Sequence, residues 1–300
     1  SFYIFNSFSY LVDPISPLVI CLICYLVVTF FNFLFTELER SKVRNAFSQY
    51  MSPVMVEKLA QSSESLKLGG ERKEMTFLFS DIRGFTSISE KYKGDPEALT
   101  DLINNLLTVL SNEILNNQGT IDKYMGDCIM AFWNAPSDDP KHREKSIDAA
   151  FAMSKALDQL NKDLKRFDDD KLSVGIGINT GECIVGNMGS DKRFDYTVLG
   201  DAVNLASRLE GQSGNYGMQI ILGEGSIKGL SKEKYFVCEL DVIAVKGKSE
   251  PVTIYTVFDK VDSEIADDDF LTEHQDFLKN YRSQNWLKAR EHIDKYRFSK

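Results

Sequence analysis

The chain has 300 residues, room for one large or two small domains. Its composition, 43% hydrophobic and 26% charged, is ordinary for a globular protein. The net charge of −9 argues against a nucleic-acid partner, because no basic stripe is present to neutralise a phosphate backbone. The five cysteines are scattered and odd in number, so we expect reduced thiols, with Cys21 and Cys24 packed in an apolar run.

The first distinctive element is an apolar run from Pro17 to Phe35, within a stretch that carries no charge. About 20 such residues cross the core of a bilayer, so the run predicts a transmembrane helix over 17–36. Basic residues follow it between 40 and 44, and only Asp13 precedes it, which predicts that everything after residue 36 lies in the cytoplasm at the inner membrane. A buried helix of a soluble protein and a signal peptide are the alternatives.

The segments beside this run are expected to connect a sensor with the rest of the chain. Residues 1–16 are mostly apolar, and the chain begins at Ser1 rather than Met, so we expect them to end an upstream membrane or sensor region. Residues 37–70 continue a helical pattern that Pro53 interrupts. This pattern predicts either a solvated linker or a short helical coupling element.

From residue 71 to 260, strand and helix patterns alternate, which predicts one α+β domain with a mixed sheet and helices on one side of it. In chain order we expect a strand over 75–82, a helix over 96–117, a hairpin over 120–133, a helix over 139–167, two strands over 173–187 around a Thr180-Gly181 turn, a strand over 194–199, a helix over 202–211, and two strands around 246–248.

Residues 261–300 read as an acidic linker and a helical tail. The aromatic and apolar residues of this tail recur at helical spacing, which predicts two short amphipathic helices with a turn near Ser283. One helix pair of a tetratricopeptide-like repeat fits the same pattern, but a single unit is too little to assign a repeat.

Three motifs in the α+β domain suit nucleotide chemistry. Phe77-Leu-Phe-Ser-Asp81-Ile-Arg-Gly-Phe-Thr86 ends a strand on an acid and continues into a loop whose N–H groups and hydroxyl suit a phosphate. Asp122-Lys123-Tyr-Met-Gly126-Asp127 places a second acid just past a tight turn, and Tyr196-Thr197-Val-Leu-Gly-Asp-Ala-Val-Asn204-Leu-Ala-Ser-Arg208 follows. A buried acid that faces a phosphate implies a divalent metal between them.

In this order the motifs resemble the class III nucleotidyl cyclases, the enzymes that make cyclic AMP or cyclic GMP, over about residues 72–258. The resemblance implies a ferredoxin-like catalytic core with appended strands, preceded by the transmembrane helix. It also implies the activity of a membrane-anchored, bacterial-type adenylate cyclase, which converts ATP to 3′,5′-cyclic AMP and pyrophosphate for intracellular signalling.

The resemblance implies a role for each motif residue. Asp81, Asp127 and the backbone carbonyl of Ile82 would hold two divalent cations, Mg²⁺ or Mn²⁺. Lys123 and Thr197 would read the base: an ammonium donates to adenine N1, and a hydroxyl can accept from the N6 amino group. Guanylyl members typically carry Glu and a Cys-like residue at these two positions, whereas a subgroup of adenylyl members has Lys and Thr.

Asn204 and Arg208 lie four residues apart on one face of the predicted helix, where they would position the ribose and stabilise charge on the α-phosphate. The resemblance also implies a head-to-tail homodimer, in which the metal residues of one subunit meet the base readers and this helix of the other. Further substrate-binding residues are expected at Gly84, Phe85, Thr86, Arg193 and Lys246.

Three other functions compete with this interpretation. A guanylate cyclase shares the motifs, and so does a catalytically inactive relative that senses nucleotides, although the acids and Arg208 are all present here. The third is a different enzyme with the same fold type and metals, a nucleotide polymerase or a diguanylate-forming cyclase. The latter requires a Gly-Gly-Asp/Glu-Glu-Phe signature, which this sequence lacks; Gly69-Gly70-Glu71-Arg72 does not match it.

The charge asymmetry around residues 17–36 gives a prediction of topology. Protease added to intact cells should leave the catalytic part uncut, and permeabilisation should expose it, because residues after 36 are expected on the cytoplasmic side. The measurement is a blot against the C-terminal part. Recovery of the full chain in the soluble fraction, or cleavage in intact cells, would contradict the prediction.

Overall fold

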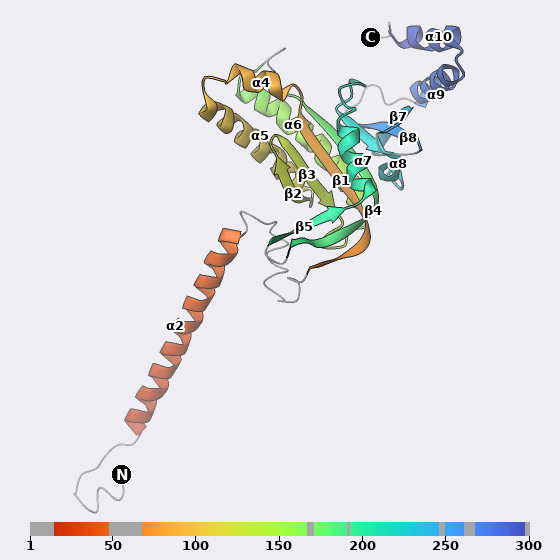
Figure 1. Ribbon diagram of the computed structural model, residues 1–300. Coiled ribbons are helices and arrows are strands. Elements are labelled where there is room, and N and C mark those ends of the chain that lie inside the picture. Colours follow the sequence, from red (N-terminus) through yellow and green to blue (C-terminus); the bar gives the residue numbers. More distant parts are fainter. Residues whose placement is uncertain are drawn as a thin grey trace, which may run out of the picture. The chain divides into compact units, whose positions relative to one another are not determined.

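The structure, a computed structural model, describes residues 15–47, 68–166, 171–190, 193–245, 250–260 and 268–297. The chain divides into two compact units, Ser1–Ser65 and Leu66–Lys300. In the first unit, helix α2 (Ile15–Phe47) contains the predicted span (Figure 1). Its stretch Leu18–Thr36 has 19 residues, a mean hydropathy of 2.6 and none of its surface buried, so it is long and apolar enough to cross a membrane.

The predictions for residues 1–14 and for the part of the coupling element over 48–67 lie outside the described residues. Between the span and that part, α2 continues as one helix to Phe47, so the beginning of the predicted coupling element is helical.

The second unit is built on one mixed sheet of eight strands in the order β2-β3-β1-β4-β6-β8-β7, with β5 paired to β4 (Figure 1). Strand β4 runs parallel to β6 and antiparallel to β1 and β5, as the prediction of a mixed sheet requires. The strands are β1 (Gly69–Ile82), β2 (Thr120–Met125), β3 (Cys128–Trp133), β4 (Val174–Ser190), β5 (Arg193–Leu199), β6 (Ile220–Gly223), β7 (Tyr235–Ile243) and β8 (Val252–Asp259).

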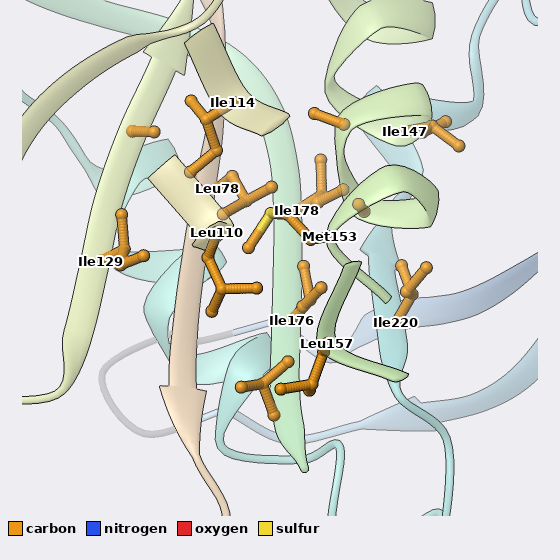
Figure 2. Close-up of a cluster of buried hydrophobic side chains, with 14 of the residues drawn as sticks. Leu78, Leu110, Ile114, Ile129, Ile147, Met153, Leu157, Ile176, Ile178 and Ile220 are labelled. Carbon is orange, nitrogen blue, oxygen red and sulfur yellow. The ribbon is translucent and has the colours of Figure 1, made fainter. Parts of the chain in front are cut away.

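Two long helices, α5 (Pro96–Asn116) and α6 (His142–Asp163), cover one face of this sheet. Asp95 caps the first of them by accepting from Ala98 N at 3.0 Å, and Pro96 opens it where no N–H partner is needed. Figure 2 shows the core beneath them, in which Leu110 and Met153 meet Leu78 and Ile178 of the sheet. The helices of this unit are α4 (Phe85–Lys91), α5 (Pro96–Asn116), α6 (His142–Asp163), α7 (Asp201–Glu210), α8 (Glu224–Ile227), α9 (Asp268–Arg282) and α10 (Trp286–Arg297).

Strand β1 alternates between two cores. Leu78 and Ile82 face the helices α5 and α6, whereas Phe77 and Phe79 belong to a second core with residues of β3, β5 and α7. Helix α7 therefore covers the opposite face, and the expectation of helices on one side only is wrong. Helix α7 covers this face because it carries an apolar stripe, from which Val203 packs into the second core.

Helix α7 approaches the sheet closely because β4 offers a glycine beneath it. A Cβ on Gly177 would lie 2.2 Å from Glu210 N and 2.3 Å from Ala206 O, so only glycine fits here. The end of the helix is as predicted, with Gly211 as its C-cap.

The expected turn at Thr180-Gly181 is absent, because β4 is one strand from Val174 to Ser190. Strand β1 pairs along this whole length, with Thr76 opposite Thr180 and Met75 opposite Gly181. The ladder with β1 continues through Thr180 and Gly181, and this pairing overrides the local turn preference of Thr-Gly.

The predicted helical tail is confirmed as α9 and α10, and α9 packs on β7. His274 Nε2 lies 2.5 Å from Glu239 O, and Arg282 Nη2 lies 2.6 Å from Glu239 Oε1. The tail therefore belongs to the same compact unit as the sheet, and the acidic linker over 261–267 lies outside the described residues.

Candidate active site

Two of the predicted metal ligands meet at one end of the sheet. Asp81 stands near the end of β1, and Asp127 follows Gly126, whose φ of 68° makes the tight turn between β2 and β3. Burial, together with a hydrogen bond and charge repulsion between the two carboxyl groups, raises the pKa of Asp81 to about 6. The sequence motifs thus produce a pair of acids that resists carrying two negative charges.

This pair suits a divalent cation. Asp127 Oδ2 is buried and has no hydrogen-bond partner among the described residues, and the N–H of Ile82 donates to Asp81 Oδ1 at 3.1 Å. Within the described residues, no group of three or more His, Cys, Asp or Glu side chains gathers to hold a metal. Magnesium commonly binds one or two carboxylates and completes its shell with substrate phosphates and water, so a bare pair of acids fits it.

A third carboxylate near Asp81 has no counterpart in the sequence predictions. Glu210, the last residue of α7, has its Oε1 2.6 Å from the position of a Cβ on Gly175, and Gly175 is the cross-strand partner of Asp81. Burial and the charge of Asp81 raise the pKa of Glu210 to about 7. Nothing in the sequence around Glu210 marks it, because its place depends on how α7 packs on β4.

The loop after Asp81 has the predicted form. Gly84 adopts a left-handed conformation with φ 69° and ψ 25°, and α4 starts at Phe85 without a side-chain cap. Phe85 is partly buried against the main core, and Thr86 is exposed. The first N–H groups of this helix are thus left for an outside acceptor.

The two predicted base readers, Lys123 and Thr197, come together through Asp122, a residue of the second motif. Thr197 Oγ1 in β5 donates to Asp122 Oδ2 in β2 at 2.8 Å, and the other oxygen, Oδ1, lies 3.9 Å from Lys123 Nζ. The Asp122 side chain is 1% exposed, whereas that of Lys123 is 44% exposed. One buried carboxylate therefore links both side chains, and the ammonium remains accessible.

A local irregularity in β2 makes this arrangement possible. Ile121 pairs with Ala131 and Lys123 with Met130, so Asp122 is an extra residue in the ladder. In a regular strand, neighbours point to opposite faces, but a bulge re-aims one of them. Asp122 and Lys123 can therefore serve the same face of the sheet.

Asn204 and Arg208 share α7 as predicted, with Asn204 exposed and Arg208 half-buried. Arg208 Nη1 is buried and has no hydrogen-bond partner in the described part of the chain. Among the described residues, no hydrogen bond or ion pair joins Asn204 or Arg208 to the acid pair or to Lys123.

The side chains of two further predicted site residues lie outside the described part of the structure. Arg193 begins β5, but its side chain lies outside the described part, and Lys246 falls in the undescribed stretch 246–249 between β7 and β8. Their roles stay predictions.

Comparison with known proteins gives the family. The adenylate and guanylate cyclase catalytic domain matches residues 70–258. The chain belongs to this family. It is 35% identical over 224 residues to an adenylate cyclase of Anabaena cylindrica, covering 72% of this chain and 43% of that protein. The chain thus spans less than half of that relative's length.

Solved structures agree on the fold of this cyclase domain. The adenylyl cyclase CyaB from P. aeruginosa is 41% identical, with a TM-score of 0.58, over 64% of this chain and 97% of that one. The guanylyl cyclase Cya2 is 34% identical, with a TM-score of 0.55, over 63% of this chain and 94% of that one. Since both kinds of cyclase share the fold, the nucleotide must be decided by the side chains that face the base.

The acid pair gives a prediction that needs no turnover. Because the pKa of Asp81 is raised in the folded, metal-free protein, its ionisation costs stability as pH rises from the usual carboxyl range through about 6. Asp81→Asn should therefore raise the Tm of the metal-free chain by about 2–4 °C at pH 7, and by less at pH 4.

Adding Mg²⁺ should raise the Tm of the wild type and leave that of Asp81→Asn unchanged, because a cation that binds only the folded state stabilises it. Asp101→Asn, an exposed acid on α5, is the matched control and should respond to Mg²⁺ as the wild type does. Equal Mg²⁺ stabilisation of Asp81→Asn and wild type would contradict the assignment.

Proposed function

We propose that this cyclase uses ATP, and that it forms 3′,5′-cyclic AMP and pyrophosphate for intracellular signalling. The observation that carries the proposal is the joint placement of Lys123 and Thr197 around Asp122. In the reaction the ribose 3′ oxygen attacks the α-phosphorus, and pyrophosphate leaves in line. The relatives named adenylate cyclase support the same choice.

The choice of ATP rests on a pattern of donors and acceptors. Lys123 donates to N1 of adenine, which accepts, and Thr197 accepts from the N6 amino group, which donates. Guanine reverses both positions, with a donor at N1 and an acceptor at O6. A donor that faces another donor, or an acceptor that faces another acceptor, loses its hydrogen bond, and this loss is a strong basis for rejecting GTP.

Asp81 and Asp127, with the carbonyl of Ile82, are proposed to hold two divalent cations, Mg²⁺ or Mn²⁺. When bound, the cations lower the pKa of the 3′ hydroxyl and neutralise the phosphates. The protein residues would supply orientation: the Ile82 N–H donates to Asp81 Oδ1, and the N–H groups at the start of α4, which has no side-chain cap, would bind the phosphate chain.

Asn204 positions the ribose and Arg208 stabilises charge on the α-phosphate in this proposal, with Arg193 and Lys246 near the triphosphate. Arg208 carries a buried guanidinium nitrogen with no hydrogen-bond partner in the ranges that the structure describes, which suits an anionic ligand. A head-to-tail homodimer supplies what one chain lacks, because the acid pair of one subunit then faces Arg208 of the other. The chain carries both sets, so the dimer has two equivalent sites.

The cell membrane is the proposed location, with α2 as the anchor and the cyclase domain on the cytoplasmic side. An exposed run of 19 residues with a mean hydropathy of 2.6 supports the anchor. The basic residues between 40 and 44 support the orientation. An upstream sensor would act through the helix that continues from the span to Phe47.

The nucleotide choice is tested by assaying the purified full chain with ATP and GTP in parallel. We expect cyclic AMP to form only with Mg²⁺ or Mn²⁺ present, and GTP to be a poor substrate. The variant Lys123→Glu with Thr197→Cys should lower the ratio of kcat/KM for ATP to that for GTP by about 100-fold, because both hydrogen-bond positions are reversed.

The contradicting outcomes are a wild type that prefers GTP, and an active double variant with an unchanged ratio. The single variant Glu182→Gln, at an exposed acid in β4, is the control for nonspecific loss of activity. It should keep the wild-type ratio.

A further inference from the structure

Asp122 links the two base readers but has no role of its own in the function proposed above, and a buried carboxylate is unusual in a strand. Asp122 is a carboxylate with a side chain only 1% exposed, at a bulge in β2. Burying a charge is costly unless it is paired and hydrogen-bonded, so the position requires partners. Its described partners are Thr197 and Lys123.

The direction of the hydrogen bond to Thr197 matters more than its strength. A hydroxyl has one proton to donate and lone pairs that accept. Thr197 Oγ1 gives its proton to Asp122 Oδ2 at 2.8 Å. Its remaining hydrogen-bonding capacity is therefore that of an acceptor, which matches the N6 amino group of adenine and opposes the O6 of guanine.

The carboxylate form of Asp122 fixes this direction. The pKa of Asp122 is raised, chiefly by burial, whereas donation from Thr197 and the charge of Lys123 lower it and favour the carboxylate. An ionised carboxylate only accepts hydrogen bonds, so Thr197 has no choice of direction. Asp195, the other nearby acid, is exposed in β5. Its charge raises the pKa of Asp122, opposite to the effect of Thr197 and Lys123.

We propose that Asp122 is a specificity-determining positioning residue, which holds the Thr197 hydroxyl as an acceptor and so restricts the site to 6-aminopurine nucleotides. This inference rests on the proposed adenylate cyclase function. Thr197 touches the base, and Asp122 acts through it. Without Asp122 the hydroxyl rotates freely and can donate to O6 as readily as it accepts from N6.

The test compares three triphosphates on the full chain: ATP, GTP and purine riboside triphosphate, which lacks the 6-amino group. Asp122→Asn keeps the size of the side chain but offers an amide that can donate to Thr197, which frees the hydroxyl proton. We expect the kcat/KM ratios of ATP to GTP and of ATP to the purine analogue each to fall about tenfold, the scale of one hydrogen bond to a charged group. A merely structural defect would lower all three substrates together.

Two comparisons isolate the route of the effect. Thr197→Val should lose the same preference, and adding Asp122→Asn to it should change the ratios no further, because Asp122 acts only through the hydroxyl. Asp195→Asn removes a nearby charge without removing this hydrogen bond, and its ratios should match the wild type. If Asp122→Asn does not fold, Asp122→Ala carries the same comparison, since alanine removes the acceptor and leaves the Thr197 hydroxyl free to rotate.

The outcomes separate this proposal from the one on which it rests. A wild type that does not select ATP refutes the adenylate cyclase function itself. A wild type that selects ATP, combined with an Asp122→Asn variant that retains both ratios, refutes the role of Asp122 alone. Additive effects of Asp122→Asn and Thr197→Val would likewise overturn the proposal, because they would show that Asp122 does not work through Thr197.

Discussion

The register of β1 is the constraint on which the site depends. Leu78 and Ile82 point into the core under α5 and α6, so the alternate residues of the strand, Phe79 and Asp81, must face the other side of the sheet. Asp81 shares this second face with Phe77 and Phe79. A slip of one residue would bury Asp81 among aliphatic side chains, where a carboxylate has no partner. Pairing with β3 on one side and β4 on the other prevents that slip.

The same face also carries polar groups of opposite charge that one chain leaves unsatisfied. Asp127 Oδ2 and Arg208 Nη1 are both buried, and neither has a hydrogen-bond partner among the residues that the structure describes. Such groups cost free energy in a folded protein unless a ligand or a second chain completes them. In the proposed mechanism, a metal–nucleotide complex would supply cations to the first and phosphate to the second, with the second group coming from the partner subunit.

Much of the fold and the acid pair could be predicted from the sequence, because local patterns determine them. The strand that ends in Asp81, the turn at Gly126 and the helix carrying Arg208 all follow from periodicity and turn chemistry. What could not be predicted depends on pairing between distant segments. The continuous β4, the second face covered by α7, and the bulge that turns Asp122 toward Thr197 each require the neighbouring strand. The site residues Arg193 and Lys246 remain predictions.

Mixing two inactive proteins tests the central claim, a site shared between subunits, most directly. Asp81→Ala removes the cation ligand and Arg208→Ala removes the guanidinium, so each homodimer should be inactive. In a mixed dimer of shared sites, both lesions fall in one site and the other is intact; random exchange should then restore about a quarter of wild-type activity. Activity no higher than that of the separate variants, with subunit exchange confirmed by differently tagged chains, would contradict the account.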